Sequence, residues 1–146
     1  MSSTSEHVEL YDRSRLLVDL DEATDPDSVD SLLVVVALRG LGETAAYDGS
    51  DSVVSHLRER FVEIVGDAGA VYCTRSTELC AIVDGGTQDL AQLLTAVDGF
   101  VHEAARIDVR VLTALVEMPR EATEAPEALG LADRRLSAAD GPIRND

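Results

Sequence analysis

Apolar positions follow strand and helical periods in separate segments of the chain. Residues 31–38, SLLVVVAL, form a continuous apolar, β-branched run that predicts a central strand buried on both faces. Residues 8–22 and 52–65 repeat apolar side chains at helical spacing, so each segment predicts an amphipathic helix. Residues 49–51, Gly-Ser-Asp, predict the turn and cap before the second helix, and Gly66 predicts its end.

Two short apolar segments in the middle of the chain predict a β-hairpin. They span residues 70–74 and 79–83, and residues 75–78 form a four-residue connection between them. Residues 88–105 then carry the clearest amphipathic helical pattern in the sequence.

The last third of the chain adds a strand and a helix. Residues 108–117 predict the strand, and a Pro/Glu-rich loop over residues 118–126 leads to a helix at residues 127–139. The predicted order is helix, strand, helix, hairpin, helix, strand, helix. Because the hairpin interrupts the alternation of strands and helices, we expect an α+β fold with a central mixed, largely antiparallel sheet flanked by helices.

Length and hydropathy favour one domain over residues 1–146, with residues 1–7 and 141–146 flexible. Hydrophobic residues make up 45% of the 146 residues, enough to form a core without disulfides or metals. The longest apolar run, residues 32–38, is far shorter than the roughly 20 residues that span a bilayer. Residues 1–7 are polar and lack an apolar signal segment, so we expect a cytoplasmic protein that does not enter the membrane.

The net charge of the chain limits which kinds of molecule can bind to it. The chain has 28 acidic and 12 basic residues, all of the latter arginine, and a net charge of −16. This balance repels nucleic acid and acidic lipid and disfavours a nucleotide triphosphate unless a local basic pocket or metal offsets it. Coding bias or salt adaptation explains the same acidic surface.

Cys73 and Cys80 are too few for a disulfide framework. They are expected to be reduced thiols, although a contact across the hairpin is geometrically possible.

Several short stretches, in order, resemble one family. LYDR at residues 10–13 opens the first helix, Gly49 and Ser50 precede the second, and ADRRL at residues 132–136 lies in the last. RSTEL at residues 75–79 occupies the hairpin. Together they resemble the GGDEF family, the diguanylate cyclase domain of bacterial signalling, from about residue 10 to residue 145. The resemblance implies a nucleotidyl cyclase-like fold.

The resemblance also implies a reaction, the metal-assisted attack of a 3′-hydroxyl on an α-phosphate. That chemistry needs carboxylates that hold two divalent ions. The acids of the family's first strand correspond here to Ala37 and Arg39, and the metal-binding carboxylate of the hairpin corresponds to Thr77. Glu78 is the acid that remains, and one carboxylate does not assemble a two-metal site. We therefore expect no catalytic residue, no metal and no cofactor.

Nucleotide recognition departs from the family in the same way. Its guanine-binding Asn and Asp correspond to Ala45 and Val54, and its phosphate-binding Lys corresponds to Asp140, whereas Arg144 matches a phosphate-binding Arg. The product-binding Arg-x-x-Asp motif is replaced by Gly-Asp-Ala-Gly at residues 66–69.

The signature itself is degenerate. Its two glycines let the backbone approach the triphosphate, and side chains now fill that space. The five signature positions hold Arg75, Ser76, Thr77, Glu78 and Leu79.

Three functions are compatible with this sequence. The first is an inactive GGDEF-like signalling domain, a pseudoenzyme that acts as a regulatory or interaction module through a protein partner or a homodimer. The second is a sensor that binds a nucleotide or another anion through Arg39, Arg75 or Arg144. The third is a diguanylate cyclase with an altered site, against which the missing acids and the net charge both argue.

Overall fold

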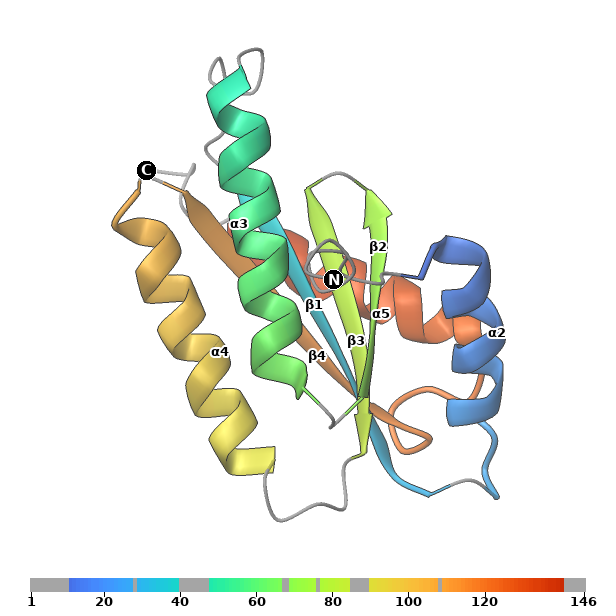
Figure 1. The fold of residues 1–146 in the computed structure, drawn as a ribbon. Coiled ribbons are helices and arrows are strands. Elements are labelled where there is room, and N and C mark those ends of the chain that lie inside the picture. Colours follow the sequence, from blue (N-terminus) through green and yellow to red (C-terminus); the bar gives the residue numbers. More distant parts are fainter. Residues whose placement is uncertain are drawn as a thin grey trace, which may run out of the picture.

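Four strands form an antiparallel sheet that helices cover on both faces (Figure 1). The computed structural model describes residues 11–27, 29–39, 48–66, 69–75, 77–84, 90–107 and 109–140. The elements in chain order are α2 (Arg13–Ala23), β1 (Ser31–Arg39), α3 (Asp48–Val65), β2 (Gly69–Arg75), β3 (Glu78–Asp84), α4 (Leu90–Ala105), β4 (Arg110–Met118) and α5 (Ala125–Asp140). The strand order is β2-β3-β1-β4, so the predicted α+β class and the central position of residues 31–38 are confirmed.

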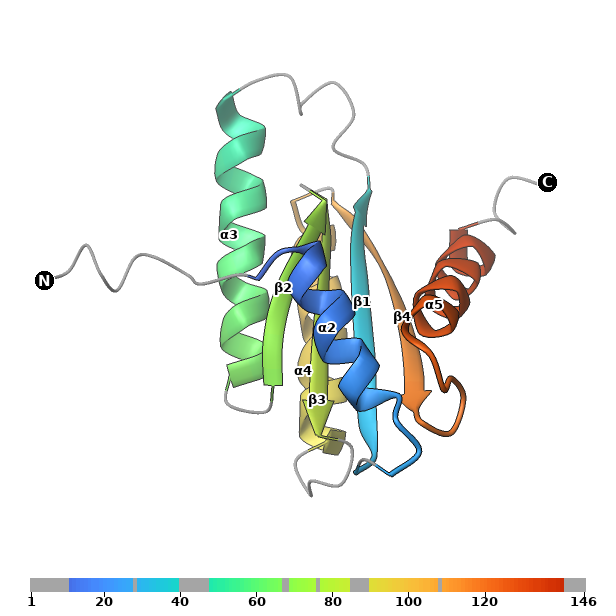
Figure 2. The ribbon, with the colours of Figure 1, turned by 90° about the vertical axis from the view of Figure 1, so that its right-hand side faces the viewer.

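β1 supplies both hydrophobic cores because its side chains alternate between the two faces. Leu32, Val34, Val36 and Leu38 pack on the face covered by α3 and α4. Leu33, Val35 and Ala37 pack on the face covered by α2 and α5. Seen along the sheet, α3 lies on one side and α5 on the other (Figure 2). The continuous apolar run of this strand therefore has the physical cause expected for it, burial on both faces.

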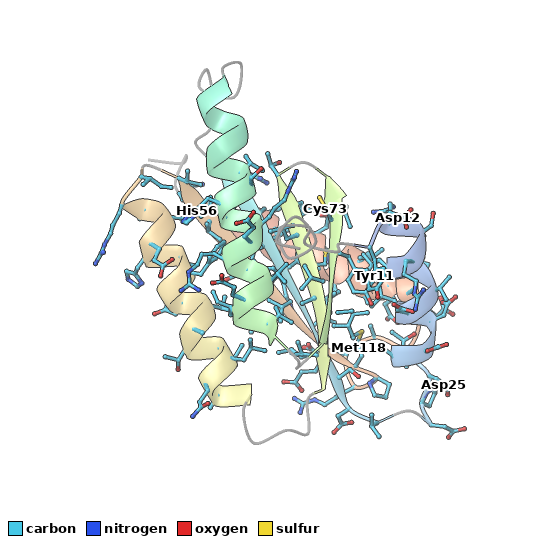
Figure 3. The ribbon with its side chains drawn as sticks, viewed as in Figure 1. Tyr11, Asp12, Asp25, His56, Cys73 and Met118 are labelled. Atoms are coloured by element: carbon cyan, nitrogen blue, oxygen red, sulfur yellow. The ribbon has the colours of Figure 1, made fainter. Side chains whose placement is uncertain are left out.

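The chain enters α2 through a short pairing with the edge of the sheet. The N–H of Tyr11 donates to the carbonyl of Val71, and the N–H of Cys73 donates to the carbonyl of Tyr11. Asp12 then caps the helix, because its carboxylate accepts a 3.0 Å hydrogen bond from the N–H of Arg15. Figure 3 shows Tyr11 and Asp12 at the start of α2, beside β2. The predicted helix over residues 8–22 is therefore wrong at residues 11 and 12, and residues 8–10 lie outside the described part of the chain.

Three predicted boundaries also differ from the structure. Residues 49–51, predicted as turn and cap, lie inside the first turn of α3. Gly and Ser destabilise a helix little at this place, because the N–H groups of a first turn have no partner within the helix. Arg75 pairs with Glu78, so the hairpin connection has two residues rather than four. α5 begins at Ala125, before Pro126, because the ring of proline fits the first turn of a helix.

The two cysteines lie on opposite faces of the sheet. Cys73 is half-buried and packs against the core under α3 and α4, whereas the buried Cys80 belongs to the core under α2 and α5. The contact considered possible from the sequence is therefore wrong, because neighbouring positions along paired strands alternate in direction. In the described part of the chain, no helix has the length and apolar content that a membrane span requires.

Candidate functional site

The end of β1 meets the hairpin where the signature-like residues lie. Ala37 is the pairing partner of Glu78, and the N–H of Leu38 donates to the carbonyl of Thr77 at 2.8 Å. Residues directly opposite in paired strands place their side chains on the same face, which here is the face of α2 and α5. The structure thus brings together the positions that the resemblance assigns to metal binding, except that Arg39 lies two residues further along β1.

The Glu78 carboxylate is held by the neighbouring strand. Oγ1 of Thr74 donates a 2.6 Å hydrogen bond to it. The same carboxylate lines a cavity of about 450 Å³ between the sheet, α2 and α5. The lining residues are Arg13, Leu17, Val35, Thr74, Glu78, Cys80, Pro126, Leu129, Gly130, Ala132, Asp133 and Leu136.

The cavity contains no activated nucleophile among its described residues. Burial, together with the nearby Glu78 carboxylate, raises the pKa of the Cys80 thiol to about 12. A thiol with that pKa stays protonated at neutral pH, and the thiol is a poor nucleophile compared with the thiolate. The charges around the cavity come from Arg13, Glu78 and Asp133, so both signs are present.

Arg39 faces another arginine. Its pairing partner in β4 is Arg110, and both residues are exposed. Nη1 of Arg39 lies 3.4 Å from the carbonyl of Leu38, a long hydrogen bond. Paired positions place both side chains on the same face, so two positive charges lie on neighbouring strands there. Arg110 was not a candidate from the sequence, since only the register of β1 with β4 reveals its position.

The other candidate residues do not join this group. Val54 is half-buried and packs against the core under α3 and α4, the opposite face from Ala37. Leu79, at the last signature position, is 1% exposed in the same core as Val54. The side chain of Arg75 and that of Asp140 are outside the described part.

Ala45, Ser76 and Arg144, together with residues 67 and 68 of the feedback-motif position, also lie outside the described part of the chain. Their predicted roles stay predictions. The same holds for the expected flexibility of residues 1–7 and 141–146.

The donors at this junction do not fit a two-metal centre. The methyl group of Ala37 is fully buried, and the Glu78 carboxylate already accepts the Thr74 hydroxyl. Over the described ranges, no three His, Cys, Asp or Glu side chains gather closely enough to hold a metal ion. Hard divalent ions prefer several oxygen ligands, so no metal-dependent step is assigned here.

The arrangement of strands and helices defines a GGDEF-like domain. The GGDEF domain of FimX from Pseudomonas aeruginosa aligns with a TM-score of 0.72 and 18% identity, over 89% of this chain and 88% of that one. The GGDEF domain of DgcB from Caulobacter crescentus, solved in complex with c-di-GMP, aligns with a TM-score of 0.73 and 15% identity, over 92% and 85% of the two chains. The active GGEEF domain of a diguanylate cyclase from Vibrio cholerae aligns with a TM-score of 0.71 and 12% identity, over 90% of this chain and 92% of that one.

These likenesses establish the fold. Sequence comparison gives no counterpart, since no protein-family model and no curated protein matches the chain. The predicted resemblance to GGDEF domains is therefore confirmed at the level of the structure.

Proposed function

We propose that this chain is a cytoplasmic GGDEF-like domain without cyclase activity that serves as a regulatory or protein-interaction module in bacterial signalling. The observation that carries the proposal is the junction of β1 with β3, where Ala37 faces Glu78 beside Thr77. Among the described residues of this junction, one carboxylate stands where metal-assisted phosphoryl chemistry needs several. Cys73 and Cys80 lie on opposite faces and cannot pair with each other, which suits a reducing compartment.

The charge of the chain supports the same proposal. A net charge of −16 repels a nucleotide triphosphate, and Arg39 adds positive charge where the resemblance implies a metal ligand. The two cores around β1 are nevertheless complete, with buried apolar side chains on both faces. A preserved core around an altered site is what a domain retained for its surface requires.

The test of inactivity is incubation of the purified protein with GTP and either Mg²⁺ or Mn²⁺. We expect neither cyclic dinucleotide nor pyrophosphate above the level without protein, while an active cyclase assayed in parallel forms both. Product formation by this chain would establish instead the third possibility, a cyclase with an altered site. The interaction part is tested separately by sedimentation and by pull-down from the source bacterium; a monomer that captures nothing would contradict it.

The alternative function is an anion or nucleotide sensor, and one observation favours it. Arg39 and Arg110 are paired positions on one exposed face, and guanidinium groups bind carboxylate and phosphate anions. Arg75 and Arg144 remain further candidates from the sequence. Thermal unfolding with inorganic phosphate, GTP and cyclic di-GMP tests this function, because a ligand that binds only the folded state raises Tm. We expect a shift that Arg39→Gln abolishes; no shift at millimolar ligand would exclude the sensor.

A further inference from the structure

β4 is an outer strand of the sheet, and its far side has no neighbouring strand in the described part of the chain. It is nine residues long and pairs with β1. An outer strand presents a row of N–H and C=O groups to which another strand can add. Whether another strand can add to β4 therefore depends on whether other residues of this chain already hydrogen-bond to these backbone groups.

The register of the sheet identifies the outward-pointing residues. The N–H of Leu38 bonds to Thr77 in the hairpin, so even-numbered residues of β1 bond toward β3 and odd-numbered ones toward β4. The odd-numbered residues of β1 pair with even-numbered residues of β4. The odd-numbered residues of β4 therefore point their backbone groups outward, and they are Val111, Thr113, Leu115 and Glu117.

Glu121 and Arg135 occupy three of the four outward backbone groups of Leu115 and Glu117, in the second half of β4. The Glu121 carboxylate accepts from the N–H of Glu117 at 2.9 Å, and the N–H of Glu121 donates to the carbonyl of Glu117 at 2.7 Å. One residue thus satisfies both groups of Glu117, as the opposing residue of a real strand would. The guanidinium of Arg135 donates to the carbonyl of Leu115.

The two side chains also hold each other in place. Arg135 donates to both carboxylate oxygens of Glu121, at 3.0 and 2.7 Å. Such a two-point ion pair fixes the orientation of both groups. The guanidinium of Arg135, together with the N–H of Glu117, lowers the pKa of Glu121 to about 2, so the carboxylate is ionised at neutral pH.

The first half of the edge is different. Within the described part of the chain, the outward N–H and C=O groups of Val111 and Thr113 form no hydrogen bond with another residue. An incoming strand therefore meets two fully open residues and a blocked carbonyl at Leu115, whereas it would meet four open residues if Glu121 and Arg135 moved away. A second copy of this chain always carries the same strand. If two β4 strands paired antiparallel about a two-fold axis at Thr113, the outward N–H and C=O groups of each strand would bond to those of the other.

We propose that the Glu121–Arg135 pair closes the outer edge of β4 and prevents a second copy of this chain from adding its own β4 there. The alternative is a purely structural role, in which the pair only anchors the turn between β4 and α5. The two roles differ in what happens to the molecular mass when the pair is removed.

Sedimentation of Arg135→Met over a range of concentrations tests the proposal. The substitution keeps the aliphatic stem and removes the groups that bond to Leu115 and Glu121. The matched control is Arg120→Met, which has the same charge change; Arg120 contacts the Glu117 carboxylate at 3.2 Å and is exposed. We expect the mass of Arg135→Met to rise about twofold over wild type, while Arg120→Met keeps the wild-type mass. A folded Arg135→Met with the wild-type mass would overturn the proposal.

A second substitution shows whether the association uses β4. Proline at position 113 removes an outward N–H and is tolerated on an outer strand. Thr113→Pro added to Arg135→Met is expected to return the mass to the wild-type value. Association that persists would overturn the proposal, since it would use another surface.

Hydrogen exchange on the wild-type protein tests the same point without any variant. The Glu117 amide is hydrogen-bonded and the Thr113 amide is open. We therefore expect the Glu117 amide to exchange at least tenfold more slowly, which corresponds to about 1.4 kcal/mol of protection. Equal exchange rates at the two amides would overturn the closed edge even if Arg135→Met failed to fold.

Discussion

The hydroxyl of Tyr72 on β2 donates a 2.5 Å hydrogen bond to the carboxylate of Asp19 on α2. Asp19 also accepts from Arg15 at 3.1 Å, and the ring of Tyr11 lies 5.7 Å from that of Tyr72. The Tyr72 residue is 1% exposed, so the hydrogen bond lies at the boundary of the core. This contact fastens the first helix to an outer strand of the sheet.

Removing that hydroxyl should lower the free energy of unfolding. Tyr72→Phe keeps the buried ring and loses a hydrogen bond to a charged group, which is worth about 1.5–3 kcal/mol. Urea denaturation followed by circular dichroism measures the loss. Val18→Ala is the control on the same helix, because Val18 is 55% exposed and its truncation should change stability by less than about 0.5 kcal/mol. Equal losses in the two variants would show that the hydrogen bond contributes nothing.

The same hydroxyl predicts a dependence on alkaline pH. Burial raises the pKa of Tyr72 above its ordinary value of 10.0, and the bonded Asp19 carboxylate raises it further. A folded-state pKa above the unfolded one means that the contribution is complete below about pH 10 and is lost as the pH rises toward the folded-state pKa. The stability difference between wild type and Tyr72→Phe should therefore be constant below about pH 10 and shrink above it. A difference that grows with pH would contradict this assignment.

Gly69 and Gly99 should respond in opposite ways to substitution by alanine. A Cβ at Gly69 would lie 1.9 Å from the carbonyl oxygen of Ile82, whereas a Cβ at Gly99 meets nothing within 4 Å. Gly69→Ala forces β2 away from β3, and we expect a loss of about 2 kcal/mol or more. Gly99→Ala, inside α4, should gain about 0.5–1 kcal/mol through helix propensity. Thermal unfolding of both variants checks the contrast, and a stable Gly69→Ala would show that the strands separate readily.

The elements that the sequence predicted well are those specified by local periodicity. The apolar run of β1 and the helical pattern of α4 each depend on neighbours within a few residues, and both were predicted in the right place. Asp12 shows the limit of such patterns. The helical spacing continues through Asp12, but its carboxylate accepts a hydrogen bond from the N–H of Arg15, so the helix starts after Asp12.

The candidate site was predictable only in part because it depends on register. The family resemblance assigned Ala37, Thr77 and Glu78 to one site, and the pairing of β1 with β3 places Ala37 opposite Glu78. Arg110 lies opposite Arg39 only because β4 pairs with β1 in one particular register, which a single sequence does not encode locally. The closed edge of β4 was missed for the same reason.

Restoring an acid at position 37 tests whether this position corresponds to a metal ligand of the family. Ala37 is fully buried and faces Glu78, so an aspartate there suffers both desolvation and repulsion from a second carboxylate. A divalent ion between the two carboxylates offsets both costs. We therefore expect Ala37→Asp to lower Tm and millimolar Mn²⁺ to recover part of the loss, as binding to the folded state requires.

Ala81→Asp provides the matched control for that experiment. Ala81 is equally buried, but it lies in the core under α3 and α4, where its pairing partners are Val34 and Val71. An aspartate there meets no second carboxylate in these pairings, so Mn²⁺ should leave its Tm unchanged. The difference between the two variants measures metal binding at the β1–β3 junction separately from general effects of the ion on stability. An equal response of both variants would show that position 37 is not equivalent to a metal position and would remove the main support for the proposed loss of cyclase activity.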